Sequence, residues 1–304
     1  MATPRSQLVD PENPLFYHLV SRCVRQSWLC GINRATRKNY THRKDWLLKR
    51  LEQLGEAFSL DIYAYAIMSN HFHLVVRYDP RVADDWSIEE VADRWHKACP
   101  PKRKDGSIDH EKREIQRQLL LCDSQKLERL RTYLGSMSFF MKMLKQPIAR
   151  RANLEDDCTG HFFDQRYYSG ALLSEAAVLS AMAYVDLNPI RVKIASSVEG
   201  SKHTSIRARL DQIDNPAELD AYLKPVISGI DRERVLPISV RAYLDHLQAL
   251  IPTGLSTWNK DKLDTWRHQV TSLKRRQRAF GTVSELSSWA VARGWKRQDE
   301  PLPN

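Results

Sequence analysis

Residues 69–77 read Ser-Asn-His-Phe-His-Leu-Val-Val-Arg, and this stretch decides how the whole sequence is interpreted. A run rich in β-branched residues after a Ser-Asn pair predicts a tight turn followed by a strand. Side chains two apart on a strand share a face, so His71 and His73 project together, while Phe72, Leu74 and Val76 point into a core. Two imidazoles on a rigid strand can supply part of a metal site, although half-buried histidines on an ordinary strand give the same pattern.

Length and composition indicate a globular protein of one large domain or two ordinary ones. The chain has 304 residues, of which 42% are hydrophobic and 28% charged. No stretch approaches the roughly 20 apolar residues that cross a bilayer, and residues 1–7 form no apolar signal core. The five cysteines show no C-x-x-C spacing, which argues against a disulfide framework or a zinc ribbon. We therefore expect a cytoplasmic, nucleoid-associated protein with no membrane contact.

The net charge of +10 favours a polyanionic partner. Basic residues gather in 37–44, in 102–104, in 274–278 and along a predicted helix at Lys142, Lys145, Arg150 and Arg151. Each cluster alone is typical of a solvated face, but together they predict nucleic-acid binding. The candidate binding residues are Arg37, Lys38, Tyr40, Arg43, Lys44, Arg166, Arg191, Lys274, Arg275, Arg276 and Arg278.

Hydrophobic periodicity predicts strands at 15–24, 61–68 and 71–78, with a helix at 45–58 that Asp45 caps. A helix at 84–98 carries Ser87 and Glu90 at capping-box spacing, and the polar stretch 99–114 predicts a loop. A long helix is expected over 127–151, and extended segments over 161–173. The next helix begins after Ser174 and ends near Leu187, because Pro189 disfavours helical geometry before it.

These elements divide the chain into three parts. Residues 1–13 form an N-terminal arm, and residues 14–198 form a catalytic domain with an insertion at about 99–125. Residues 199–304 form a mainly helical extension, in which Thr282 and Glu285 fit a capping box.

Tyr184 and Asn188 lie four residues apart and therefore share a helix face while helical geometry persists. If that face meets His71 and His73, two imidazoles and an amide oxygen lie beside a tyrosine. Such a set could hold Mg²⁺ or Mn²⁺ partly through substrate phosphate. Taken alone, Tyr184 also fits a core aromatic, and Asn188 an ordinary helix end.

The hairpin Met68-Ser69-Asn70-His71-Phe72-His73-Leu74 resembles the His-hydrophobic-His signature of the IS200-like single-tyrosine transposases. Tyr184-x-x-x-Asn188-Pro189-x-Arg191 resembles the catalytic helix of one branch, the REP-associated tyrosine transposases. The stretches 160–167 (GHFFDQRY) and 17–22 (YHLVSR) also resemble segments of that group. The resemblance covers roughly residues 14–195.

This resemblance implies an α+β fold, a ferredoxin-like α/β sandwich with an HUH-type antiparallel sheet and packed helices. It implies that His71, His73 and Asn188 bind the metal and that Tyr184 is the nucleophile. The implied activity is metal-dependent nicking and strand transfer of single-stranded DNA, often with hairpins, through a 5′-phosphotyrosine. The chain could act as a monomer or a homodimer, with Tyr184 attacking in cis or in trans.

Three alternatives stay open at this point. A catalytically silent nucleic-acid-binding regulator would retain the same residues. A relaxase or replication-initiator type of enzyme would attack with Tyr167 or Tyr168. A metal hydrolase would use the histidines without forming a covalent adduct. His18 and His161 are expected to be ordinary hydrogen-bonded side chains.

Overall fold

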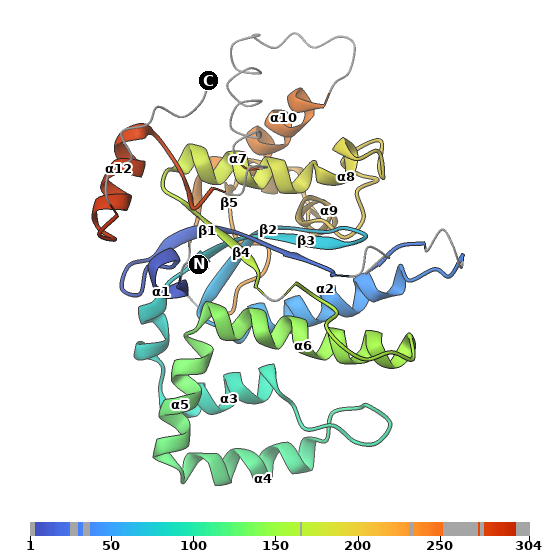
Figure 1. The fold of residues 1–304 in the computed structure, drawn as a ribbon, viewed down its shortest axis with the longest axis vertical. Coiled ribbons are helices and arrows are strands. Elements are labelled where there is room, and N and C mark those ends of the chain that lie inside the picture. Colours follow the sequence, from blue (N-terminus) through green and yellow to red (C-terminus); the bar gives the residue numbers. More distant parts are fainter. Residues whose placement is uncertain are drawn as a thin grey trace.

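The computed structural model describes residues 4–24, 30–32, 37–164, 166–230, 234–251, 273 and 277–295. Within these residues, the centre of the fold is a five-stranded sheet in the order β2-β3-β1-β4-β7 (Figure 1). Its strands are β1 (Leu15–Arg22), β2 (Leu60–Ile67), β3 (His71–Tyr78), β4 (Tyr168–Leu172) and β7 (Ala279–Phe280). Neighbouring strands pair antiparallel except β4 and β7, which are parallel. The predicted α+β class is confirmed.

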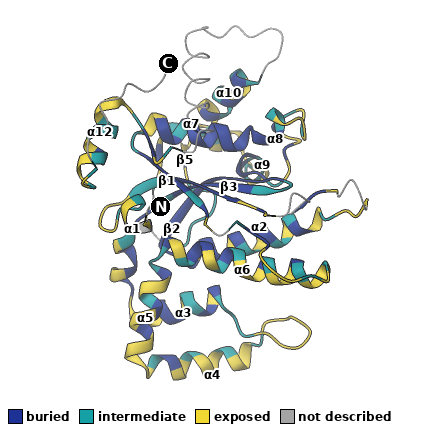
Figure 2. Ribbon diagram, viewed as in Figure 1, coloured by how far each residue is buried: buried dark blue, intermediate teal, exposed yellow. Residues whose placement is uncertain are grey.

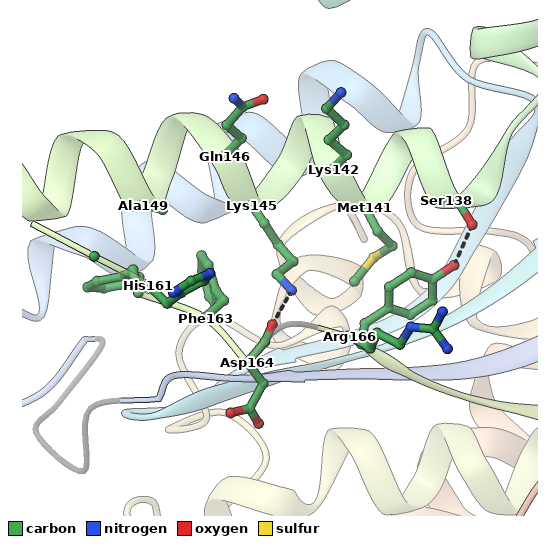
Figure 3. A pocket seen from close by; sticks show the side chains of 13 residues that line it. Ser138, Met141, Lys142, Lys145, Gln146, Ala149, His161, Phe163, Asp164 and Arg166 are labelled. Carbon is green, nitrogen blue, oxygen red and sulfur yellow. Dashed lines mark hydrogen bonds between the residues drawn. The ribbon is translucent and has the colours of Figure 1, made fainter. Parts of the chain in front are cut away.

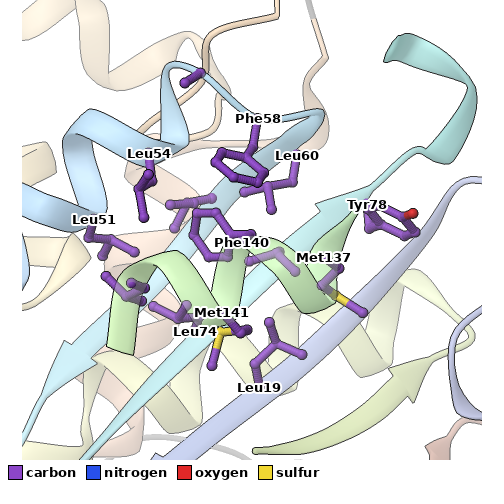
Figure 4. Close-up of a cluster of buried hydrophobic side chains, with 14 of the residues drawn as sticks. Leu19, Leu51, Leu54, Phe58, Leu60, Leu74, Tyr78, Met137, Phe140 and Met141 are labelled. Atoms are coloured by element: carbon purple, nitrogen blue, oxygen red, sulfur yellow. The ribbon is translucent and has the colours of Figure 1, made fainter. Parts of the chain in front are cut away.

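Helices cover both faces of this sheet. Helices α2 (His42–Gly55) and α6 (Met137–Glu155) pack on one face, and α7 (Glu175–Asp186) packs on the other (Figure 1). Alternation along the strands sorts the side chains, so Leu19 and Leu74 join the core beneath α6. Phe58 and Phe140 meet edge to face in that core, 5.4 Å between ring centroids (Figure 4). The opposite face of β1 and β3 carries the histidines.

A helical layer lies beyond α6, and part of it occupies residues that were expected to form a loop. It comprises the 3₁₀ turn η1 (Pro80–Asp85), α3 (Ile88–Ala98), α4 (His110–Leu121) and α5 (Ser124–Leu134). Residues 110–114 are therefore helical rather than a loop, because the Asp109 carboxylate caps α4 by accepting from the Lys112 amide. Figure 2 shows α4 as mostly exposed.

The single helix expected over 127–151 is wrong. The chain breaks at Gly135 and restarts at α6, whose first turn is capped by Ser136 accepting from the Phe139 amide (3.2 Å). The Tyr78 hydroxyl holds the break by donating to the Gly135 carbonyl (2.7 Å). A serine is a better N-cap than a helix interior residue, and this local preference wins here.

Helix α2 begins at His42, so Asp45 lies in its first turn and does not cap it. Strand β3 has the predicted bounds, and β1 and β2 deviate by at most two residues. The helix expected over 84–98 begins only at Ile88, because Ser87 caps it. Ser174 caps α7 as predicted, and Thr282 and Glu285 form the predicted capping box at α12 (Val283–Val291).

In the described residues after α7, short strands accompany the helices. The elements are α8 (Asn188–Arg191), α9 (Ser205–Asp211), η2 (Pro216–Asp220), β5 (Tyr222–Leu223), β6 (Leu236–Ser239) and α10 (Val240–Leu250). Strand β7 extends the central sheet, because it pairs in parallel with β4 and lies close to Gly170 of that strand. A Cβ atom at Gly170 would lie 2.6 Å from the Phe280 ring, so only glycine fits this position.

The N-terminal residues are tied to the C-terminal ones. The short helix α1 (Arg5–Leu8) precedes Asp10, whose amide donates to the Tyr17 hydroxyl (2.7 Å). The Asp10 carboxylate pairs with Arg293 at 3.2 Å. Among the described helices, none is long and apolar enough to cross a membrane.

Candidate active site

The two histidines of β3 lie side by side on the face that α7 covers. The ring centroids of His71 and His73 are 4.8 Å apart and the rings are nearly perpendicular. The Asn70 side-chain oxygen accepts a hydrogen bond from His71 Nδ1 (2.6 Å). This bond places the proton of His71 on Nδ1, and Nε2 then carries the lone pair that could bind a metal.

His18 of β1 is a site residue that the sequence analysis did not identify. It is 1% exposed, and its Nε2 lies 2.9 Å from Nδ1 of His73. The hydrogen bond to His18 therefore engages Nδ1 of His73, just as Asn70 engages Nδ1 of His71. A hydrogen-bond partner on one ring nitrogen fixes the orientation of an imidazole whose other nitrogen can bind a metal.

Tyr184 lies against this histidine cluster. Helix α7 starts at the Ser174 cap, whose hydroxyl accepts from the Ala177 amide (3.3 Å), and it carries Tyr184 in its last turn. The Tyr184 ring centroid is 5.5 Å from that of His73 and 5.8 Å from that of His18. Tyr184 is 8% exposed, and its hydroxyl makes no hydrogen bond within the described residues.

The hydroxyls of Tyr167 and Tyr168, the alternative nucleophiles, both make hydrogen bonds. The Tyr167 hydroxyl lies 3.2 Å from the Ser138 hydroxyl on the α6 side of the sheet. The Tyr168 ring reaches His18, with 5.9 Å between centroids, but its hydroxyl donates to the Gln277 carbonyl. Of these three tyrosines, Tyr184 alone combines contact with the histidines and a hydroxyl that makes no hydrogen bond in the described part of the chain.

Helical geometry continues past Tyr184 despite Pro189. Backbone bonds link Leu187 to Ala183 and Arg191 to Leu187, both 3.0 Å long, so Tyr184 and Asn188 lie one turn apart on one face. Pro189 occupies an early position of α8, where its missing amide hydrogen costs nothing. Asn188 is 4% exposed, and its amide nitrogen has no hydrogen-bond partner within the described residues.

Arg191 completes the end of this helix. Its guanidinium carbon lies 4.6 Å from the centroid of the Tyr184 ring. One of its terminal nitrogens is buried and unpaired as far as the described residues go. A guanidinium beside the phenol whose N–H group has no partner in the described residues is suited to bind a phosphate oxygen.

A buried polar network holds the end of α7 to the C-terminal residues. Asp186 is fully buried and accepts from the Ser205 hydroxyl (2.5 Å), the Ile206 amide (2.9 Å) and the Tyr243 hydroxyl (2.8 Å). Burial raises the pKa of Asp186 to about 6. The acid at the end of a largely apolar helix was the one hint of this network in the sequence.

The predicted nucleic-acid residues fall into separate places. Arg43 is 1% exposed and pairs with Glu155 (2.6 Å) and Asp156 (2.5 Å), so its guanidinium does not reach solvent. It also packs over the Tyr40 ring at 4.0 Å. The half-buried Lys44, whose pKa is lowered by burial, lines a cleft of about 590 Å³ beside Ser69 and Pro189.

The other predicted residues are more scattered. Arg37 and Lys38 are exposed. Arg166 lines a second cleft, described below, and Arg278 packs over Trp295 at 4.6 Å. Lys274, Arg275 and Arg276 lie outside the described residues.

A metal site built from His, Cys, Asp and Glu alone does not occur in the described part of the chain. No three such side chains gather there in a way that could hold an ion. Any ion held by His71 and His73 would have to take its other ligands from an amide, from water or from a substrate phosphate.

Comparison with known proteins gives one distant likeness. No family model and no curated protein matches the sequence. Among solved structures, that of a REP-associated tyrosine transposase bound to a REP hairpin aligns with a TM-score of 0.40 and 11% identity. The alignment covers 78% of this chain and 99% of the other. At these values the likeness does not make this chain a member of that family.

Proposed function

We propose that this protein is a single-tyrosine DNA nicking and strand-transfer enzyme of the HUH type, with Tyr184 as its nucleophile. One observation carries the proposal: Tyr184 packs on the His18–His73 pair and its hydroxyl makes no hydrogen bond in the described residues. The strand order β2-β3-β1-β4, with α2 between β1 and β2 and α6 between β3 and β4, supports a ferredoxin-like assignment of the core.

The residues at the site fit a divalent cation. His71 and His73 would bind it through Nε2, because Asn70 and His18 engage the Nδ1 atoms. Asn188, which is 4% exposed and lies one helix turn from Tyr184, would add its amide oxygen, the atom through which an amide binds a hard cation. When bound, Mg²⁺ or Mn²⁺ would withdraw charge from a phosphate and orient it for in-line attack.

The chemistry assigned to the chain is one transesterification. The Tyr184 oxygen forms a bond to phosphorus as the bond from phosphorus to the 3′-oxygen breaks. The proton that the phenol gives up ends on that oxygen, which leaves as a 3′-hydroxyl. A 5′-phosphotyrosine results, and attack by another 3′-hydroxyl reverses the step without ATP. Arg191, next to the phenol ring, would hold a non-bridging phosphate oxygen as charge develops on it.

We propose attack in cis, with Tyr184 packed on the histidines of its own chain. The ties from Asp186 to Ser205 and Tyr243 hold the same helix end to residues of that chain. A monomer would then contain a complete site.

Covalent trapping on a denaturing gel tests the proposal. The wild-type chain, Tyr184→Phe and the matched control Tyr168→Phe are incubated with Mn²⁺ and labelled single-stranded hairpin DNA. We expect an adduct that chelation abolishes, that Tyr184→Phe lacks and that Tyr168→Phe retains. An adduct that persists in Tyr184→Phe would refute the assignment.

A catalytically silent DNA-binding regulator is the second candidate. The low exposure of Tyr184, 8%, favours it, because a scissile phosphate must reach a largely covered phenol. Tight hairpin binding without an adduct on any tested DNA would favour the regulator.

A further inference from the structure

A second cleft lies on the opposite side of the sheet from Tyr184. It occupies about 570 Å³ between α6 and residues 160–167 (Figure 3). Pockets of this size hold small organic groups. The cationic and aromatic side chains of its lining are Lys142, Lys145, His161, Phe163, Arg166 and Tyr167.

The charge of this cleft is positive. Lys142 and Lys145 approach from α6, and Arg166 approaches from the facing segment. The one carboxylate among the lining side chains belongs to Asp164, and Figure 3 shows it on the side away from α6. The Lys145 ammonium donates to the Asp164 backbone carbonyl (3.0 Å), which ties α6 to the segment that faces it.

Flat rings accompany these cations. The Lys145 ammonium lies 5.3 Å from the Phe163 ring centroid, and the Tyr167 ring lines the wall with its hydroxyl on Ser138. His161 is exposed at the cleft. A groove that combines cations with π-faces is the usual device for a single-stranded nucleic acid, whose bases can stack while its phosphates follow the charge.

The cleft and the histidine site meet at one end of the sheet. Arg22, at the end of β1, pairs with His71 on one side and accepts a backbone bond from Asp164 (2.8 Å) on the other. The same segment continues into β4 at Tyr168, whose ring contacts His18. This end of the sheet offers one route by which a DNA strand could reach both the Tyr184 site and the cleft.

We infer that this cleft binds a single-stranded nucleic-acid segment, with its phosphates on Lys142, Lys145 and Arg166 and a base against the exposed ring of His161. This inference deepens the proposed function, on which it rests, because it assigns a place to the strand that flanks the scissile phosphate.

The test uses fluorescence anisotropy with the full chain in EDTA, so that no covalent step contributes. The probes are a labelled DNA hairpin with a single-stranded arm and the same hairpin with a blunt end. The pocket variant is Lys142→Gln/Arg166→Gln, which leaves the Lys145 contact intact. The matched control is Lys112→Gln/Lys126→Gln, which removes the same charge from exposed positions of α4 and α5.

We expect the pocket variant to bind the armed hairpin at least about tenfold more weakly than the control does. Its plot of log affinity against log salt should be shallower by about 1.4, since each phosphate contact on a single strand contributes about 0.7. The blunt hairpin should bind both variants equally.

Two results would overturn the inference. Equal binding of the armed hairpin by the pocket and control variants would remove the cleft from the nucleic-acid path. An equal loss for armed and blunt hairpins would assign the cleft to duplex. Because this assay detects no adduct, it can succeed in a chain that fails the Tyr184 trapping test, and it can fail in one that passes.

Discussion

Replacing Tyr243 by phenylalanine should destabilise the protein by about 2 kcal/mol. The ring of Tyr243 is fully buried, and its hydroxyl donates to one carboxylate oxygen of Asp186 at 2.8 Å. Ser205 and Ile206 bind the other oxygen and remain in Tyr243→Phe. The variant therefore loses one charge-assisted hydrogen bond in a site without water access, and such bonds contribute about 1.5–3 kcal/mol.

The same substitution should slow DNA cleavage without weakening DNA binding. Asp186 lies two residues from Tyr184, and its three hydrogen bonds fix the end of the helix that carries the nucleophile. Loosening that end misplaces Tyr184 relative to the histidines, whereas the basic cleft beside α6 is untouched. A fall in cleavage rate at constant affinity distinguishes this positioning role from a loss of folded protein.

Urea unfolding followed by circular dichroism measures the stability change. Tyr222→Phe is the matched control, because it removes the same hydroxyl from a side chain that is 60% exposed. If Tyr243→Phe unfolds within about 0.5 kcal/mol of the wild type, which is the range of ordinary surface changes, the reasoning about Asp186 is wrong.

Three further predictions concern other parts of the chain. His18→Ala should weaken Mn²⁺ binding about 10- to 100-fold by titration calorimetry, because it removes the partner of His73 Nδ1; unchanged affinity would contradict this role. Arg43→Met should lower stability by about 2 kcal/mol in thermal unfolding, since it leaves the carboxylates of Glu155 and Asp156 without their buried partner; an unchanged midpoint would show that this pairing is dispensable. Burial lowers the pKa of His96, so the unfolded chain binds a proton more readily and stability should fall as pH drops below about 6.5; His96→Leu should flatten that dependence, and an identical pH profile would argue against it.

Strands β1, β2 and β3 and the serine caps of α3 and α7 were predictable because they depend on local chemistry. Alternation defined β3, and single serines defined the starts of α3 and α7. The contact between Tyr184 and His73 was expected only through two motifs considered together, since nothing local joins residues 111 positions apart. The break before α6 was missed because hydrophobic periodicity runs across it.

The roles of His18 and Arg43 could not be predicted, because they depend on contacts between segments that are far apart in the sequence. His18 looked ordinary because its partner, His73, lies on another strand. Arg43 belonged to a basic run that suggested an exposed DNA contact, but the fold buries it against residues 155 and 156. In both cases the role comes from a neighbour more than 50 residues away, which composition and spacing cannot reveal.

Strand β7 lies near the end of the sequence but pairs with the central sheet, and this limits how far the chain can be shortened. A chain that ended near residue 198 would contain every proposed catalytic residue, yet β4 would become an open edge with unpaired backbone groups. Gly170, shaped to admit Phe280, would then face solvent beside that edge. Copies of such a fragment would associate through their open sheet edges. The shortest version of this protein that stays unaggregated should therefore extend through α12.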